Sequence, residues 1–322
     1  MKTAVVLLCV LTAAPAYAQG QGRGAQGQGR AAQGQGRGRQ AGPPATETVA
    51  PGIAGVVAAG TKVVVVKDGF QSTEGPVALP DGSLLFTEPG ASKIFKIDKN
   101  DNITLFLENT NRADGLGFDS KRRLFAVTAN TAEILYPEAS KKVLAGPFKD
   151  RPNDLVVDKK DGVFFTLTTP KEIYYIPAGG KPVVVSNDMK SGHGITLSPD
   201  DKTLYVADST SEYLVAYDVQ ADGKLTNKRN FGKYEGVKKT ETGAESNADG
   251  IAVDSEGRVY VGTLPGVQVF SAKGEHLGLI PTSQRPQNLA FAGPDGKTLY
   301  LCGGTALFKV QMLSKKYAGR PK

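Results

Sequence analysis

The sequence predicts an all-β protein, a six-bladed β-propeller built from four-stranded blades. Short segments rich in Val, Tyr, Phe and Thr recur along the chain, bounded by turn residues such as Asp-Gly and Pro-Asp. Six of them follow a polar residue at intervals of roughly 40 residues, with one longer interval, and about four short strands fit such a period. The six openings are Glu74, Asp114, Asn153, His193, Asp249 and Gln287.

The N-terminal part is expected to lie outside the propeller. Residues 1–18 contain Lys2, a short apolar run and the segment Ala16-Tyr17-Ala18, the pattern of a secretory signal peptide cleaved after Ala18. Residues 19–50 begin with a Gln-, Gly- and Arg-rich stretch that cannot bury enough apolar surface to fold, so we expect a disordered tail. Residues 51–322 then form the catalytic propeller, and the protein is expected to be secreted or periplasmic.

The charge of the chain is concentrated in this tail. Of the formal net charge of +7, five units come from residues 1–40, which contain no Asp or Glu, so the remainder carries +2. A nearly neutral fold predicts no nucleic-acid partner. No apolar run is long enough for a membrane span, and we expect a monomer that binds a small molecule.

The two ends of the propeller are expected to close the ring together. The last repeat, 287–313, supplies only three strands, whereas "TKVVVVKDG" at 61–69 precedes the first blade and has no blade of its own. We expect this N-terminal strand to pair with the last blade, because the pairing removes an open sheet edge.

The six opening residues are predicted to surround the central channel, since the first strand of each blade runs beside it. All six are polar, all carry a lone pair, and three are carboxylates. Like charges in a narrow channel repel and lose hydration, and a divalent cation offsets both costs. Oxygen ligands suit Ca²⁺ or Mg²⁺, whereas the imidazole of His193 suits Zn²⁺, Mn²⁺ or Fe²⁺. The alternative is a channel that holds only water and hydrogen-bonded side chains.

The repeats resemble a known family. The segments "TEGPVALPDGSLLFTE", "RPNDLVVDKKDGVFFT", "DGIAVDSEGRVYV" and "PQNLAFAGPDGKTLYL" are similar to those of the senescence-marker-protein/gluconolactonase family, which includes regucalcin. The resemblance covers about residues 62–316. It implies a six-bladed propeller with one divalent metal, commonly Ca²⁺, in the channel, and a hydrolase of cyclic esters such as sugar-derived lactones.

The resemblance also implies site residues. Glu74, Asn153 and Asp249 match positions of metal ligands, and His193 stands where the family has a ligating Asn. This departure leaves two interpretations open, a site that prefers Zn²⁺ or Mn²⁺ to Ca²⁺, or a His193 that is free to act as a base. Arg151 matches a substrate-contacting position.

Two further departures concern the substrate. Asp114 replaces the Asn that the family usually has in the second blade, and residues 166–176 are shorter than usual and lack an expected Asp. We therefore expect the substrate to be bound by Arg151, Asn153 and Asp114. The long connection at 232–248 predicts either a lid over the channel or an ordinary surface insertion.

The expected function is metal-dependent lactone hydrolysis. The metal would polarise the lactone carbonyl, and Asp249 would orient or deprotonate the attacking water, with His193 as a second catalytic candidate. Two alternatives remain open. One is a lyase or isomerase on the same fold that uses His193 as acid–base, and the other is a non-catalytic ligand-binding propeller.

Overall fold

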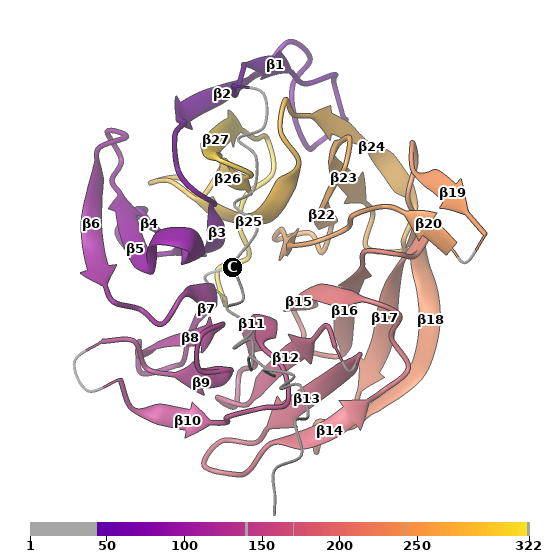
Figure 1. Ribbon diagram of the computed structural model, residues 1–322. Coiled ribbons are helices and arrows are strands. Elements are labelled where there is room, and N and C mark those ends of the chain that lie inside the picture. The colour runs from indigo at the N-terminus through magenta and orange to yellow at the C-terminus, as the bar shows by residue number, and fades with distance from the viewer. Residues whose placement is uncertain (1–43, 139–140, 170, 242, 321–322) are drawn as a thin grey trace, which may run out of the picture. The chain divides into compact units, whose positions relative to one another are not determined.

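A computed structural model describes residues 44–138, 141–169, 171–241 and 243–320. The predicted signal peptide, and the predicted tail up to residue 43, lie outside the described residues. Within these ranges the chain folds into six antiparallel blade sheets arranged around a central axis, together with one separate two-stranded sheet (Figure 1). The prediction of an all-β, six-bladed propeller is confirmed.

The first three blades follow the order of the chain from the channel outward. Blade one comprises β3 (Glu74–Ala78), β4 (Leu84–Glu88), β5 (Lys93–Ile97) and β6 (Ile103–Glu108), with a 3₁₀ turn η1 (Pro89–Ala91). Blade two comprises β7 (Ala113–Phe118), β8 (Leu124–Thr128), β9 (Glu133–Leu135) and β10 (Val143–Ala145). Blade three comprises β11 (Pro152–Val157), β12 (Val163–Leu167), β13 (Glu172–Ile176) and β14 (Val183–Ser186).

Two of the remaining blades repeat this order, and the last recruits strands from the N-terminal side. Blade four comprises β15 (Gly192–Leu197), β16 (Thr203–Asp208), β17 (Tyr213–Val219) and β18 (Leu225–Lys233). Blade five comprises β21 (Ile251–Val253), β22 (Val259–Thr263), β23 (Gly266–Phe270) and β24 (His276–Pro281). Blade six comprises β25 (Pro286–Ala292), β26 (Thr298–Gly303), β27 (Ala306–Gln311), β2 (Lys62–Lys67) and β1 (Thr48–Val49).

The sixth blade closes the ring as the sequence predicts. Strand β2 pairs antiparallel with β27, with Val63 opposite Val310 and Val65 opposite Phe308. Strand β1 then pairs with β2 and adds a fifth strand, so the sheet begins before residue 51, the boundary expected from composition. Backbone hydrogen bonds therefore join the two ends of the propeller and cover the edge of the last blade.

The core lies between neighbouring blades, because both faces of each sheet are covered. Strands β4, β8 and β12 are buried at every residue. Leu84 and Phe86 of blade one pack with Ala290 and Tyr300 of blade six, and the other blade junctions bury similar clusters. This burial of apolar surface holds the inner strands in a fixed frame around the channel.

The long connection between blades four and five forms a short hairpin, β19 (Lys238–Thr240) and β20 (Gly243–Glu245). Its backbone is tied to blade four by hydrogen bonds from Ala244 N to Thr210 O (3.0 Å) and from Asn247 N to Ser209 O (3.0 Å). The hairpin lies at the periphery of the ring and not over the channel (Figure 1). The structure therefore favours a surface insertion over a lid.

The C-terminal segment covers one end of the channel. Arg320 donates from Nη1 to the carbonyl of Leu197 (2.7 Å), the last residue of β15, and Ser314 hydrogen-bonds the hydroxyl of Tyr260 (2.8 Å). Leu197 ends an inner strand, so the C-terminal segment lies at the end of the ring where the inner strands finish, and the starts of those strands lie at the opposite end.

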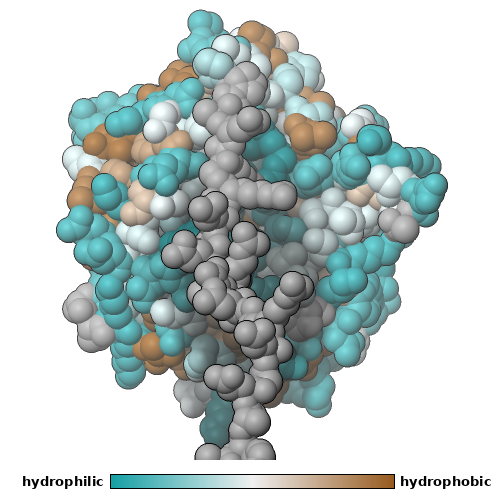
Figure 2. Space-filling view, viewed as in Figure 1, coloured by the Kyte–Doolittle hydropathy of each residue, from teal (hydrophilic) through white to brown (hydrophobic). Residues whose placement is uncertain are grey.

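The outer surface in the view of Figure 2 is mostly hydrophilic, with scattered hydrophobic residues. Among the described residues, no helix has the length and apolar character needed to cross a membrane.

Candidate active site

The structure brings the predicted ring residues to one end of the channel. Because the inner strands of a propeller run side by side in the same direction, the residues at their starts meet. Glu74 is the first residue of β3, and Asp249 lies just before β21. The other four are second residues of inner strands: Asp114 in β7, Asn153 in β11, His193 in β15 and Gln287 in β25.

Glycine follows the ring residue in four of the six blades and allows the inner strands to approach closely. A Cβ on Gly115 would lie 2.4 Å from Oδ1 of Asp154, and a Cβ on Gly250 would lie 2.3 Å from Oδ1 of Asn288. No real side chain tolerates such distances, so the channel is this narrow only because these residues are glycine.

The remaining two blades place a polar side chain where the others have glycine, and sequence reasoning missed both. Asp154 and Asn288 are 1% and 2% exposed, and Nδ2 of Asn288 lies 3.5 Å from Oδ2 of Asp154. They belong to β11 and β25, which face each other across the channel (Figure 1). The available signal was the break in the glycine pattern at these two positions.

The carboxylates of the site interact strongly, as the ring of like charges predicts. Burial raises the pKa of Glu74 well above its usual value, and the nearby carboxylates of Asp114, Asp249 and Asp154 raise it further. The hydrogen bond from Nε2 of Gln287 to Oε1 of Glu74 (3.0 Å) lowers this pKa, but its effect is smaller than those of burial and of the three carboxylates. Four acidic side chains therefore converge on one space.

Asp114 shows the same effect. Burial is the main cause that raises the pKa of Asp114 to about 7, and the charges of Asp249 and Asp154 add to it. The guanidinium groups of Arg151 and Arg112 oppose this shift, but Arg151 Nη1 lies 3.8 Å from Oδ2 of Asp114, and its side chain is 52% exposed. This ion pair is therefore loose.

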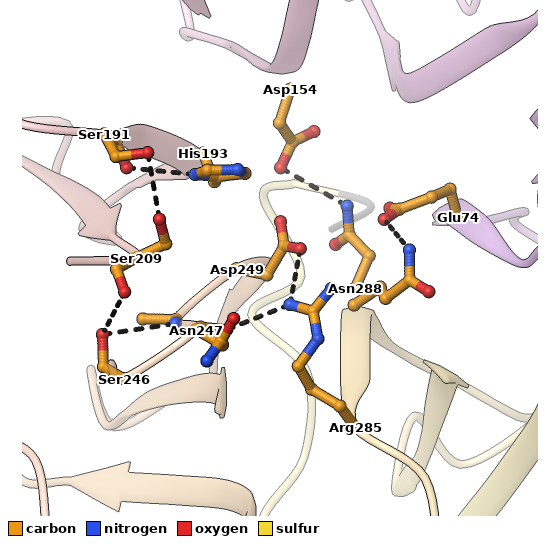
Figure 3. Close-up of polar contacts among 12 residues, drawn as sticks. Glu74, Asp154, Ser191, His193, Ser209, Ser246, Asn247, Asp249, Arg285 and Asn288 are labelled. Atoms are coloured by element: carbon orange, nitrogen blue, oxygen red, sulfur yellow. Dashed lines mark hydrogen bonds and ion pairs between the residues drawn. The ribbon is translucent and has the colours of Figure 1, made fainter. Parts of the chain in front are cut away.

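His193 presents one ring nitrogen to the channel. Its Nδ1 lies 3.0 Å from the carbonyl oxygen of Ser191. Because a carbonyl only accepts hydrogen bonds, Nδ1 carries the proton and Nε2 keeps a lone pair. In Figure 3 the Nε2 side of the ring points toward Asp154 and Asp249. This nitrogen can therefore bind a cation or accept a proton.

Arg285 is a further site residue that the sequence analysis did not identify. Its Nη1 donates to Oδ2 of Asp249 (2.9 Å) and to the carbonyl of Asn247 (3.0 Å), and its side chain is 23% exposed (Figure 3). A guanidinium thus lies directly beside the carboxylate expected to activate water. The segment Arg285-Pro286 repeats the segment Arg151-Pro152, and this repeat was a usable signal.

The donor set fits a divalent cation, although the side chains do not form a finished coordination sphere. Among the described residues, no three His, Cys, Asp or Glu side chains are grouped closely enough to hold a metal ion. Glu74, His193 and Asp249 nevertheless lie at the same end of the channel, and Asn153, half-buried, makes no hydrogen bond to the described residues. The crowded negative charge that raises the pKa of Glu74 is what a bound cation would relieve.

Comparisons with known proteins agree with this architecture. The family model for the SMP-30/gluconolactonase/LRE-like region matches residues 72–304. The gluconolactonase of Zymomonas mobilis is 23% identical over 304 residues, covering 81% of this chain and 84% of that protein.

Solved structures of similar fold include two named relatives. A gluconolactonase from Xanthomonas campestris superposes with a TM-score of 0.73 at 22% identity, covering 85% of this chain and 99% of that one. A calcium-binding regucalcin from Agrobacterium tumefaciens gives a TM-score of 0.65 at 17% identity, covering 82% and 95% of the two chains. At these identities the likeness concerns the fold.

Proposed function

The chain belongs to the SMP-30/gluconolactonase/LRE-like family, and from this premise we propose that it is a metal-dependent hydrolase of sugar-derived lactones. Lactonase activity is supported by the family and by the gluconolactonase relative that matches most of the chain. The observation that carries the metal-dependent mechanism is the convergence of four carboxylates, those of Glu74, Asp114, Asp154 and Asp249, at one end of the channel.

The proposed metal site uses Glu74, Asn153, His193 and Asp249. The calcium-binding regucalcin of the same fold supports Ca²⁺, whereas the lone pair of His193 Nε2 supports Zn²⁺ or Mn²⁺. When bound, such an ion would supply Lewis-acid chemistry that draws electron density from the lactone carbonyl.

Asp249 is the proposed general base. Arg285 holds Oδ2 of Asp249, which orients the carboxylate and leaves Oδ1 to accept a proton from water. The water oxygen then bonds to the carbonyl carbon, the ring carbon–oxygen bond breaks, and the proton passes from Oδ1 to the departing ring oxygen. The product is an open-chain hydroxy acid.

The remaining site residues bind and shield the substrate. Asp114 and Arg151 form a partly exposed pair at the channel mouth, where they can hydrogen-bond the hydroxyl groups of a sugar-derived ring. The amide of Asn153, which has no side-chain hydrogen-bond partner among the described residues, can bind the same ring. The C-terminal segment lies at the other end of the ring, so we expect the substrate to enter from the site end.

His193 supports a second candidate function. Its Nε2 lone pair faces the carboxylates, a position from which it could remove a proton from a substrate carbon in a lyase or isomerase reaction. Replacement His193→Asn separates the two functions. If the variant still hydrolyses lactones, His193 acts as a metal ligand that Asn can replace. If the variant loses an elimination or isomerisation reaction that the wild type catalyses, His193 acts as the base.

The main experiment tests a panel of lactones and measures hydrolysis by the acid that it releases. Protein loaded with Ca²⁺, Mn²⁺ or Zn²⁺ should open aldonolactones, chelator should abolish the activity, and the metal should restore it. Asp249→Asn should be inactive, and Arg229→Gln, on the outer strand β18 of blade four, should retain activity. Absence of hydrolysis with every metal would contradict the lactonase function, and full activity in chelator would contradict the metal.

Export of the protein is also part of the proposal, supported by the signal-like pattern of residues 1–18. Mature protein recovered from the native cell should begin at Gln19. An N-terminus at Met1 or Lys2 would contradict export through this segment.

A further inference from the structure

The two arginines of the site occupy equivalent places on opposite sides of the ring. The segments Arg151–Asp154 and Arg285–Asn288 begin the inner strands of blades three and six, and both read Arg-Pro followed by two polar residues. Each arginine reaches back to the aspartate of the preceding blade, from Arg151 to Asp114 and from Arg285 to Asp249. The two arginines therefore stand at the starts of the inner strands of opposite blades, three and six.

Both guanidinium groups keep donors that are available to a ligand. Arg285 makes both of its side-chain hydrogen bonds through Nη1, and within the described part of the chain Nη2 and Nε have no hydrogen-bond partner. Arg151 approaches Asp114 only to 3.8 Å, beyond good hydrogen-bond distance. A guanidinium presents its N–H groups as a planar fork that matches a carboxylate.

The charges of the site require these arginines when a cation is bound. Four carboxylates converge on the channel, and the proposed divalent cation offsets two of them. Arg285 pairs with Asp249 at 2.9 Å and Arg151 lies 3.8 Å from Asp114, so both guanidinium groups reduce the repulsion that an entering anionic group would meet. A site meant only for neutral sugar lactones needs no second guanidinium, because hydroxyl groups are bound by carboxylates and amides.

We propose that Arg285, opposite Arg151, is a specificity-determining residue that binds a carboxylate of the substrate. The preferred substrate is then a lactone of a sugar dicarboxylic acid, whose second carboxylate would accept from the Nε and Nη2 donors that Arg285 does not use for Asp249 or Asn247. This inference rests on the proposed lactonase function for its kinetic test and is independent of it for its binding test.

The kinetic test compares two lactones that differ at one carbon. Glucaro-1,4-lactone carries a carboxylate where glucono-1,4-lactone carries a hydroxymethyl group. In the metal-loaded protein, kcat/KM should be at least ~10-fold higher for the glucaro compound, the size of a charge-assisted hydrogen bond. Arg285→Gln should remove this ratio, Arg285→Lys should keep part of it, and the surface control Arg229→Gln should leave it unchanged. Because Arg285 also contacts Asp249, its replacement can slow the hydrolysis of both lactones. The readout is therefore the ratio of their kcat/KM values.

The binding test uses the open-chain acids and titration calorimetry on the same metal-loaded proteins. Glucarate should bind at least ~10-fold more tightly than gluconate to the wild type, and Arg285→Gln should lose that preference. An unchanged preference in Arg285→Gln, or a wild type that favours the neutral lactone and gluconate, would overturn the inference. If no lactone is hydrolysed but glucarate is preferred through Arg285, the proposed function fails and the carboxylate site stands.

Discussion

The two halves of the ring, blades one to three and blades four to six, use the same scaffold with different chemistry. Equivalent positions carry Glu74 and His193, then Asp114 and Asp249, then Asp154 and Asn288. The first half supplies a carboxylate at each of these positions, whereas the second half has a nitrogen-bearing side chain at two of the three. The apolar strands that follow are alike in both halves, so the fold constrains the frame and leaves the blade starts to vary.

The comparison also separates the two aspartates that share a position. Asp249 is fixed by Arg285 at 2.9 Å, whereas Asp114 is met by Arg151 only at 3.8 Å, and its pKa is raised to about 7. An oriented carboxylate suits a general base, and a loosely held one suits a contact to the substrate. The asymmetry therefore supports the proposal that Asp249, in the second half of the ring, is the general base.

The largest expected effect comes from replacing each of the two aspartates, Asp249 and Asp114, by asparagine. Asp249→Asn should lower kcat for lactone hydrolysis by about 10³-fold or more, because it removes the proposed base, which typically contributes 10²–10⁴-fold, and a metal ligand. Asp114→Asn should cost less than about 30-fold and act mainly on KM. Steady-state kinetics on the same lactone measures both, and equal losses in kcat would contradict the asymmetry.

The scaffold, in contrast, should respond equally in the two halves. Gly115→Ala and Gly250→Ala each place a Cβ within 2.4 Å of a buried side-chain oxygen of the next blade. Each should lower the free energy of unfolding by about 1–3 kcal/mol, the usual cost of overpacking. Gly192→Ala is the matched control, since its Cβ would meet no atom closer than 3.7 Å. Thermal unfolding measures all three, and a loss confined to one half would show that the halves differ in packing as well.

His193 occupies in blade four the position that Glu74 occupies in blade one, and its replacement by asparagine tests whether it selects the metal. His193→Asn should weaken Zn²⁺ binding by about 10- to 100-fold, while Ca²⁺ binding falls less or improves, because an amide oxygen is a harder ligand than imidazole. Calorimetric titration of the metal-free protein with each ion gives the two affinities. If both ions lose affinity equally, His193 does not select the metal.

The smallest expected effect concerns pH and the first half of the ring. The pKa of Asp114 lies near 7 in the folded protein against an ordinary value of 3.8, so the folded state holds a proton that the unfolded chain releases. The stability that this group contributes is present at low pH and is lost as the pH rises to about 7. With chelator present, the wild type should therefore lose stability between about pH 5 and pH 8, whereas the Asp114→Asn variant should not. The melting temperature of the variant minus that of the wild type should rise by a few degrees over this range. A difference that stays constant with pH would contradict the shift.

Much of the fold followed from local features of the sequence. Each blade start combines a polar residue, an apolar run and a turn, and the run "KVVVV" lacked a blade, so the six blades and the closure by β2 could be predicted. The residues that surround the channel could be predicted as well, because residues at the same position of each repeat occupy the same place in each blade.

The missed residues depend on contacts that no local pattern contains. Asp154 and Asn288 are 134 positions apart and meet only because the ring brings opposite blades together. Arg285 precedes its strand, and its partner Asp249 lies in another blade. A guanidinium beside an acidic centre becomes visible only when the closed ring is known.

The most direct test of the account is the position of the metal. Crystals soaked with Mn²⁺ and measured by anomalous diffraction should show one strong site at the open end of the channel, with oxygen or nitrogen atoms of Glu74, His193 and Asp249 at about 2.0–2.6 Å, the range of metal–ligand distances in proteins. An ion bound only elsewhere, or an active protein with no ion in the channel, would contradict it.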